Sequence, residues 1–256
     1  LNKLYRIIYK LVFTPIIVKN QIPIIRTQDD PYVEKCLGIP LKQCPWISVG
    51  SDTMLFHPDE HTRARFREAN NISQDAFIVL YAGKLDESKG GMLLAETIKE
   101  KFDEKREVIF LVVGKTSGEY GKKVEEEFAA SENRIIRFPT QKYRDLAQFY
   151  QAADLAVFPR QCSLSFYDVQ ACGVPVVFEN NNINVERSKH GNGLMFQAND
   201  VGNFREKISE MIRMPEDQYK RMQENSIEFV RSEFDYADIA QKYMTVMENV
   251  VQKSRS

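Results

Sequence analysis

The clearest pattern in the chain is a series of short apolar runs that alternate with segments apolar on one helical face. Apolar runs of strand length occupy Phe77–Tyr81, Val108–Val113, Arg134–Phe138, Asp154–Phe158, Pro175–Phe178 and Gly193–Phe196. Helical segments fall between them, near residues 89–102, 120–130, 143–152 and 165–172. Continuous apolar strands that alternate with amphipathic helices are typical of a parallel sheet with helices on both faces. The pattern therefore predicts a doubly wound α/β domain over about residues 45–200.

The chain after residue 200 is predicted to be helical. An apolar stripe over residues 204–212 precedes a helix that begins at Pro215 and ends near Phe234. Asp235 is the expected N-cap of a last helix with one long apolar face. That face packs either on this domain or on a domain outside this sequence.

The first 28 residues are basic and apolar, with no acidic residue and the basic residues Lys3, Arg6, Lys10, Lys19 and Arg26. We expect a helix that Pro15 ends near Phe13, and then a short strand over Gln21–Thr27. A basic apolar helix suits an anionic membrane surface, or alternatively the interior of a larger domain. The first residue is Leu rather than Met, so we expect this chain to be part of a longer protein.

Composition narrows the classes of function. The 256 residues include 35 Lys and Arg against 36 Asp and Glu, a net charge of −1 that lacks the basic excess of a nucleic-acid-binding protein. No apolar run reaches the ~18 residues of a membrane-spanning helix. The four cysteines lack CxxC spacing and only three histidines occur, so we expect a reducing compartment and no metal site.

Candidate chemistry lies in the loops that follow the strands, because doubly wound sheets bind ligands at the carboxyl ends of their strands. The loop after Phe77–Tyr81 contains Gly83, Lys84 and Lys89. Backbone N–H groups at the start of a helix and two lysine charges favour a phosphate. The loop matches neither GxxxxGK[ST] nor GxGxxG. A surface loop with solvated lysines fits the same spacing.

Two further loops carry candidate residues. Gly114 follows Val108–Val113, where a glycine lets a ligand approach the backbone. Ser163 and Ser165 begin a helix that carries Asp168. The N–H and hydroxyl groups suit phosphate oxygens, and the carboxylate suits sugar hydroxyls. Alternatively, Asp168 only complements the helix dipole.

The order of these motifs resembles a known family. The segments VGSD (49–52), YAGKLDESKG (81–90), FLVVGKTSG (110–118), RFPTQKYRDLAQFYQAADLAVFPR (137–160), DVQACGVPVV (168–177) and EFDYADIAQKY (233–243) are similar to the C-terminal, donor-binding half of retaining GT-B glycosyltransferases of family 4, the group 1 type. The resemblance implies a Rossmann-like sheet with C-terminal helices. It also implies that residues 1–44 are a remnant of the preceding acceptor domain and linker, that 45–234 bind the donor, and that 235–256 return towards the N-terminal domain.

The resemblance also implies a site for a nucleotide-diphosphate sugar. Lys84 and Lys89 match basic residues that bind the diphosphate, and they would stabilise the charge of the leaving group. Asp168 matches a glutamate that usually holds the ribose hydroxyls. The other expected binding positions are Gly50, Gly83 and Gly114 at strand ends, Phe138 and Thr140 for the base, and Ser163, Leu164 and Ser165 for the distal phosphate.

The chain departs from the family pattern at three of these positions. Lys84 replaces an arginine, and Asp168 is one methylene shorter than glutamate. Arg160 stands where a first glutamate usually contacts the transferred sugar, which leaves the sugar and the activity open. No Asp-x-Asp pair occurs, which agrees with metal-independent, retaining transfer of a hexose without a cofactor.

Three functions remain open at this stage. The first is a donor-binding glycosyltransferase fragment that binds a UDP-sugar. Its acceptor would be a polysaccharide or a lipid-linked glycan bound by a missing N-terminal domain, so the fragment alone would transfer little sugar. The second is a GT-B sugar-nucleotide epimerase, and the third is a non-catalytic nucleotide-sugar-binding module. We expect a cytoplasmic protein without nucleic-acid partners, peripheral to the inner face of the plasma membrane if residues 1–28 bind lipid.

Overall fold

A computed structural model describes residues 3–28, 31–160, 162–181, 184–187 and 190–255. The chain divides into two compact units, one formed by residues 1–50 with 234–256 and the other by residues 51–233. The second unit contains residues 51–200 of the predicted α/β domain, and residues 45–50 fall in the first unit.

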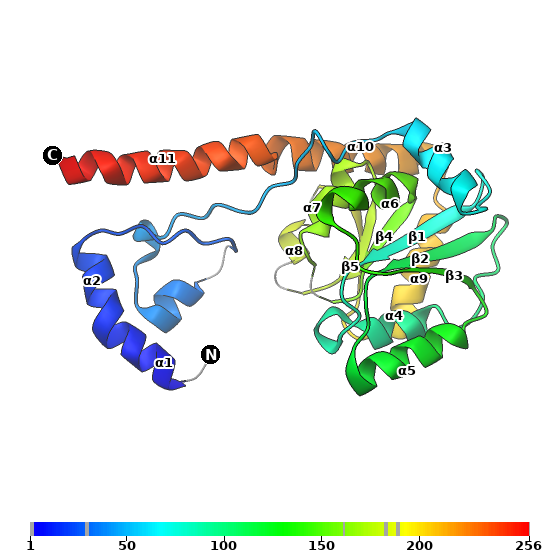
Figure 1. Cartoon of the computed structure of the whole chain (residues 1–256), viewed down its shortest axis with the longest axis horizontal. Helices are drawn as coiled ribbons and strands as arrows, with labels where there is room; N and C mark the ends of the chain where they lie inside the picture. Colours follow the sequence, from blue (N-terminus) through cyan, green and yellow to red (C-terminus); the bar gives the residue numbers. More distant parts are fainter. Residues whose placement is uncertain (1–2, 29–30, 161, 182–183, 188–189, 256) are drawn as a thin grey trace. The chain divides into compact units, whose positions relative to one another are not determined.

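The α/β unit is built on a six-stranded sheet in which every strand pairs in parallel, in the order β3-β2-β1-β4-β5-β6 (Figure 1). Its strands are β1 (Phe77–Ala82), β2 (Val108–Val113), β3 (Arg134–Phe138), β4 (Leu155–Phe158), β5 (Val176–Glu179) and β6 (Gly193–Phe196). This sheet confirms the predicted doubly wound, Rossmann-like fold. The strand order reverses between β1 and β4, and such a switch point opens a ligand crevice at the carboxyl ends of the strands.

Helices cover both faces of the sheet (Figure 1). Helices α4 (Gly91–Thr97), α5 (Gly118–Ala129) and α9 (Val201–Ile212) lie on one face, where they enclose the main apolar core with the buried side chains of β1 and β2. The other face carries α3 (Glu60–Ala69), α6 (Ala147–Ala152), α7 (Ser165–Ala171) and α10 (Glu216–Glu233). The short helix α8 (Asn184–Arg187) follows β5.

Two predicted helices differ from those observed. The helix expected to reach residue 102 is α4, which ends at Thr97. Beyond it, the side chains of Ser131 and Asn133 donate to the Ile98 carbonyl, which would otherwise continue the helix. The Asn133 side chain also accepts a hydrogen bond from the Phe102 N–H. The helix expected over 143–152 begins as a 3₁₀ turn, Tyr143–Leu146, before α6. A further helix, α3, lies in the polar segment 57–75, for which the apolar pattern predicts no element.

The other unit begins with a helix that passes through Pro15. It consists of α1 (Lys3–Ile8), a π-helical turn (Tyr9–Phe13) and α2 (Thr14–Lys19). The predicted end at Phe13 is therefore wrong. Pro15 falls in the first turn of α2, directly after the wide π turn, where a missing N–H costs little.

The predicted strand over Gln21–Thr27 is also wrong. The segment forms only one parallel bridge, between Arg26 and Trp46. Pro23 and Pro45 lack the N–H groups that a longer ladder needs. The unit further contains a π-helical turn (Val33–Leu37), a 3₁₀ turn (Leu41–Gln43) and α11 (Tyr236–Arg255), which Asp235 caps by accepting from the Ala237 N–H at 2.8 Å.

Among the residues that the structure describes, no helix combines the length and the apolar character needed to cross a bilayer.

Candidate functional site

A cleft of about 360 Å³ opens at the carboxyl ends of β1, β2 and β3, beside the loop that follows β4. We call it the carboxyl-edge cleft. Most of the predicted binding residues line it, drawn from four loops far apart in the sequence: Gly83, Lys84, Gly114, Thr140, Ser163, Leu164, Ser165 and Asp168. Its remaining walls include Lys115, Gln141, Tyr143, Leu146 and Tyr150. The topology therefore brings the predicted phosphate and sugar groups to one place.

The turn that carries the two lysines is held by a single carboxylate. Asp86 accepts hydrogen bonds from the Lys89 N–H at 3.0 Å and from the Ser88 hydroxyl at 2.7 Å. The Ser88 hydrogen bond is the main reason that the pKa of Asp86 lies below its usual value. The Tyr81 hydroxyl donates to the Lys84 carbonyl at 2.6 Å. The lysine turn is therefore ordered by the side chains of Asp86 and Tyr81 before any ligand binds.

The two lysines occupy different positions. Lys84 has an exposed side chain that lines the cleft. Lys89 is half-buried and is not among the residues that line the cleft. Its charge nevertheless acts on the Cys162 thiol: burial raises the pKa of Cys162, and the positive charge of Lys89 partly opposes that rise. Gly90 follows at φ +75°, and a Cβ there would lie 2.8 Å from the Cβ of Pro159. This close packing joins the lysine turn to the loop after β4.

The loop after β4 offers unused donors. The hydroxyls of Ser163 and Ser165 hydrogen-bond to each other, and Ser165 also donates to the Ala82 carbonyl at 3.4 Å. Within the described part of the chain, the N–H groups of Ser163, Leu164 and Ser165 donate to no protein acceptor. All three residues line the cleft. These N–H groups are therefore available to an anionic ligand.

Asp168 is the acidic residue of the cleft and is only 2% exposed. Its Oδ1 accepts from the hydroxyls of Ser51 at 2.7 Å and Tyr143 at 3.4 Å. No described residue donates a hydrogen bond to Oδ2. Burial raises the pKa of Asp168 to about 6, against the opposing effect of the two hydroxyl donors. One carboxylate oxygen is thus fixed by the protein, and the other is left for a ligand.

Two tyrosines that the sequence reasoning did not single out complete this end of the cleft. Tyr143 and Tyr150 both pack against the buried ring of Phe56, at centroid distances of 5.1 and 5.5 Å. Burial raises the pKa of both tyrosines, and the charge of Asp168 adds to the effect. Tyr143 and Tyr150 lie within the motif quoted for residues 137–160, but the motif gave no reason to place either side chain beside Asp168.

Arg160, which stands in the place of an expected glutamate, does not line the cleft. Its guanidinium donates to the Glu87 carbonyl at 2.8 Å and to the Asn199 side chain at 2.9 Å. The arginine therefore ties the lysine turn to the loop before α9.

The structure gives Gly50 and Phe138 packing contacts outside the lining of the cleft. A Cβ on Gly50 would lie 2.9 Å from the Cα of Tyr236, so the missing side chain permits close packing at the start of α11. Phe138 packs its ring against Phe149 at 4.9 Å, and its carbonyl accepts from the Gly114 N–H. Phe138 thus supports the turn that carries Gly114.

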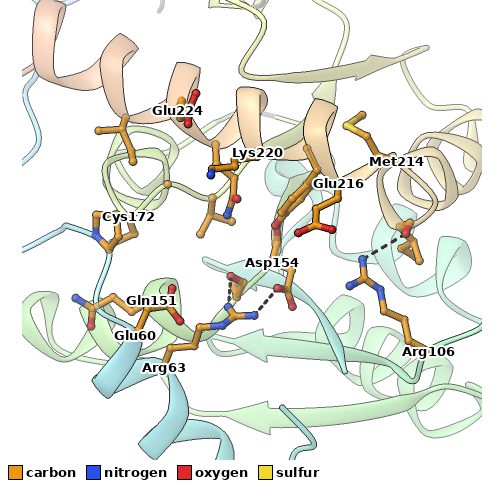
Figure 2. A pocket seen from close by; sticks show the side chains of 18 of the residues that line it. Glu60, Arg63, Arg106, Gln151, Asp154, Cys172, Met214, Glu216, Lys220 and Glu224 are labelled. Carbon is orange, nitrogen blue, oxygen red and sulfur yellow. Dashed lines mark hydrogen bonds and ion pairs between the residues drawn. The ribbon is translucent and has the colours of Figure 1, made fainter. Parts of the chain in front are cut away.

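A larger cavity, of about 1220 Å³, lies at the opposite, amino-terminal edge of the sheet, between α3 and α10 (Figure 2). Asp154 is its central carboxylate and is already bound by Arg63 and Arg67 and by the Ile78 N–H. The carboxylate of Asp154 is therefore occupied by contacts within the protein, which assigns it to the stability of the fold. Among the described residues, no group of three or more His, Cys, Asp or Glu side chains is placed to hold a metal ion.

Comparisons with known proteins agree with this architecture. The sequence profile described as Glycosyl transferases group 1 matches residues 62–229. D-inositol 3-phosphate glycosyltransferase 1 of Catenulispora acidiphila is 30% identical over 144 residues, which are 51% of this chain and 34% of that protein. The match covers only about a third of the length of this protein and of two further D-inositol 3-phosphate glycosyltransferases, from Segniliparus rotundus and Xylanimonas cellulosilytica.

Solved structures show the same fold. A glycosyltransferase from Rickettsia africae superposes with a TM-score of 0.83 at 18% identity, covering 95% of this chain and 67% of that one. The Anabaena protein HepE, in complex with UDP and glucose, gives a TM-score of 0.80 at 17% identity, covering 97% of this chain and 68% of HepE. At such identities the likeness shows the fold alone.

Proposed function

This chain belongs to the glycosyl transferases group 1 family, and we propose that its residues 51–233 bind the nucleotide-sugar donor of such an enzyme. The observation that carries the proposal is the composition of the carboxyl-edge cleft. Cationic and N–H groups suited to a diphosphate and a carboxylate suited to ribose hydroxyls line the same cavity.

The diphosphate is assigned to Lys84 and the N–H groups of residues 163–165. Lys84 makes no ion pair within the described residues, so its charge is available to the ligand. Backbone N–H groups that point into a cleft bind phosphate oxygens without needing to reorganise. Lys115 lines the same wall and adds a second positive charge.

The nucleoside is assigned to the other end of the cleft. Asp168 Oδ2 would accept hydrogen bonds from the ribose hydroxyls, while Ser51 holds Oδ1 from behind at 2.7 Å. Hydrogen bonds to an ionised carboxylate are stronger than those between neutral groups. Thr140 and Gln141, in the loop after β3, would face the base.

Transfer of a hexose from this donor leaves a nucleoside diphosphate with growing negative charge. Lys84 in the cleft and Lys89 behind it would stabilise that charge as the glycosidic bond to phosphate breaks. We assign this neutralisation to the lysines and N–H groups rather than to a metal ion, and we propose retention at the anomeric carbon. The proposed donor is a UDP-sugar. HepE, which shares the fold, binds UDP in its solved complex.

The acceptor is assigned to a part of the enzyme outside residues 51–233. We propose that residues 1–44 belong to that part, that the acceptor is a glycan or glycolipid, and that this chain alone transfers little sugar. A cytoplasmic position against an anionic membrane is proposed from the N-terminal helix. Its side chains include exposed Leu4, Ile7 and Leu11, and residues 1–28 carry no acidic side chain.

A non-catalytic nucleotide-sugar-binding module is the second candidate, and one observation favours it. Arg160 replaces the expected acidic residue and is fully engaged with Glu87 and Asn199. Such a module would bind the same donor and release no nucleoside diphosphate in any complex with an acceptor.

Thermal unfolding with a panel of nucleoside diphosphates tests donor binding, with Mg²⁺ and with EDTA. A ligand present at 100 times its dissociation constant adds about 2.7 kcal/mol to the free energy of unfolding. We expect stabilisation by one nucleotide, unchanged by EDTA. Stabilisation by none of them would contradict the proposal.

A further inference from the structure

Tyr143 occupies an unusual position at the nucleoside end of the carboxyl-edge cleft. It begins the 3₁₀ turn between β3 and α6, and its side chain is 47% exposed although its ring packs edge-on against the fully buried Phe56. Its hydroxyl donates to Asp168 Oδ1 over 3.4 Å, a long hydrogen bond. Tyr143 thus presents a supported aromatic face to the cleft while its polar end touches the carboxylate.

We propose that Tyr143 determines the affinity for the nucleoside part of the ligand, by orienting Asp168 through its hydroxyl and by contacting the nucleoside with its ring. The inference rests on the donor-binding function proposed above and deepens it. It separates Tyr143 from the groups at the diphosphate end, such as Lys84, which recognise phosphate alone.

The orienting role follows from the hydrogen bonds of Asp168. Two hydroxyls from segments far apart in the sequence, Ser51 and Tyr143, converge on Oδ1. Two donors on one oxygen resist rotation of the carboxylate and keep Oδ2 available. They differ in position, because Ser51 is fully buried and Tyr143 lines the cleft. Only Tyr143 is therefore placed to contact a ligand directly.

The same hydrogen bonds keep Asp168 ionised. Its pKa is raised to about 6, mainly by burial and to a smaller extent by the charge of Asp52, while the Ser51 and Tyr143 hydroxyls act in the opposite direction. The other titratable groups that sense Asp168 are Tyr150 and Cys172, both neutral because burial raises their pKa values. Loss of either donor raises the pKa of Asp168, so the protonated form, which accepts ribose hydroxyls poorly, persists to higher pH.

The test is calorimetric titration of the 256-residue chain with UDP and with pyrophosphate between pH 5.5 and 8.5. Tyr143→Phe keeps the ring and removes the donor, Tyr143→Ala removes both, and Ser51→Ala removes the other donor without touching the cleft. At pH 6.5 we expect Tyr143→Phe and Ser51→Ala to bind UDP about fivefold more weakly than wild type, the effect of one hydrogen bond. Both variants should recover in part at pH 8.5, where Asp168 is ionised in each but still lacks one of its two orienting donors.

Tyr143→Ala should bind UDP more weakly at every pH, because the ring contact is lost. Pyrophosphate affinity should stay within twofold of wild type in all three variants. Circular dichroism of each variant verifies folding, and Tyr143→Phe, which keeps the packing on Phe56, remains informative if Tyr143→Ala unfolds.

The outcomes separate this inference from the proposed function. Wild-type affinity for UDP in both Tyr143 variants, with weakened binding in Asp168→Asn, would overturn the role of Tyr143 and leave donor binding intact. Equal loss of UDP and pyrophosphate affinity would show a merely structural role and would also overturn it. Failure of the wild-type chain to bind any nucleoside diphosphate would overturn both proposals.

Discussion

A Cβ at Gly114 would lie 1.8 Å from the carbonyl oxygen of Gly83. The turns after β1 and β2 are therefore in direct backbone contact. The Gly83 N–H also donates to the Val113 carbonyl, at the end of β2, at 2.9 Å. Gly114 also has φ +143°, a backbone conformation that residues with a side chain rarely adopt. The glycine that the sequence suggested for close approach of a ligand serves first for close approach of two loops.

Gly114→Ala should therefore damage the cleft itself. The clash is with backbone and cannot be relieved by a rotamer change, so we expect a loss of more than about 3 kcal/mol in urea unfolding, as for severe overpacking. Gly118→Ala is the matched control, because its φ is also positive, at +66°, but a Cβ there meets nothing within 4 Å. It should lose only about 1 kcal/mol. Similar losses in the two variants would contradict the steric explanation.

Lys84→Ala should weaken UDP and pyrophosphate to the same extent. The lysine is assigned to the diphosphate alone, and removal of one charge contact at a phosphate costs about tenfold in affinity, with less effect at high salt. Lys122→Ala is the control, since Lys122 forms an exposed ion pair with Glu119. A selective effect of Lys84→Ala on UDP, measured by calorimetry, would move this residue to the nucleoside end.

Arg67 should contribute strongly to folding rather than to binding. It is fully buried and donates to Asp154 and to the carbonyls of Ser73, Gln74, Ala76 and Ala152. Arg67→Ala removes one of the two guanidinium groups that bind Asp154 and takes the donor from the carbonyls of Ser73, Gln74 and Ala76, which predicts a loss of about 3–5 kcal/mol in urea unfolding. Arg134→Ala removes an exposed ion pair with Glu107 and exposed hydrogen bonds to the carbonyls of Asn70 and Asn71, and it should stay within about 1 kcal/mol of wild type. A small effect at Arg67 would contradict the assignment of the amino-terminal cavity to structure.

Asp168 should make the protein less stable as the pH rises. Its folded pKa, about 6, exceeds the ordinary value of 3.8, so between these values the folded state holds a proton that the unfolded state has released. The contribution of Asp168 to the free energy of unfolding therefore falls from pH 4 to pH 6 and is then constant. Relative to Asp168→Asn, wild type should lose about 2 kcal/mol between pH 4.5 and 7.5. Parallel pH profiles for the two proteins in urea unfolding would contradict a raised pKa.

The sequence predicted the sheet well because its central strands β1, β2 and β4 are continuous apolar runs. Helix α3 is not predicted by the hydrophobic pattern because its residues are mostly polar. It packs through Phe66 and the buried Arg67, and sequence alone suggests an exposed position for an arginine. The helix through Pro15 depends on a π turn, which no local pattern indicates.

The candidate site could be predicted for residues in the loops directly after the strands. Lys84, Ser163 and Asp168 converge because parallel strands end at the same edge of the sheet. The contact between Tyr143 and Asp168 arises from tertiary packing on Phe56, which links three segments with no shared periodicity. Arg160 departs from the family pattern in the sequence, and its partners, Glu87 and Asn199, are visible only in the structure.

The most direct test of donor binding compares UDP and pyrophosphate on Asp168→Asn and wild type by calorimetry at pH 7.5, without metal. Asn keeps the shape of the side chain and an oxygen for Ser51, but removes the charge that would hold the ribose. We predict that UDP affinity falls at least tenfold, about 1.4 kcal/mol, while pyrophosphate affinity is unchanged. Equal affinities of the variant and wild type for UDP, or equal losses for both ligands, would contradict the placement of the nucleoside on Asp168.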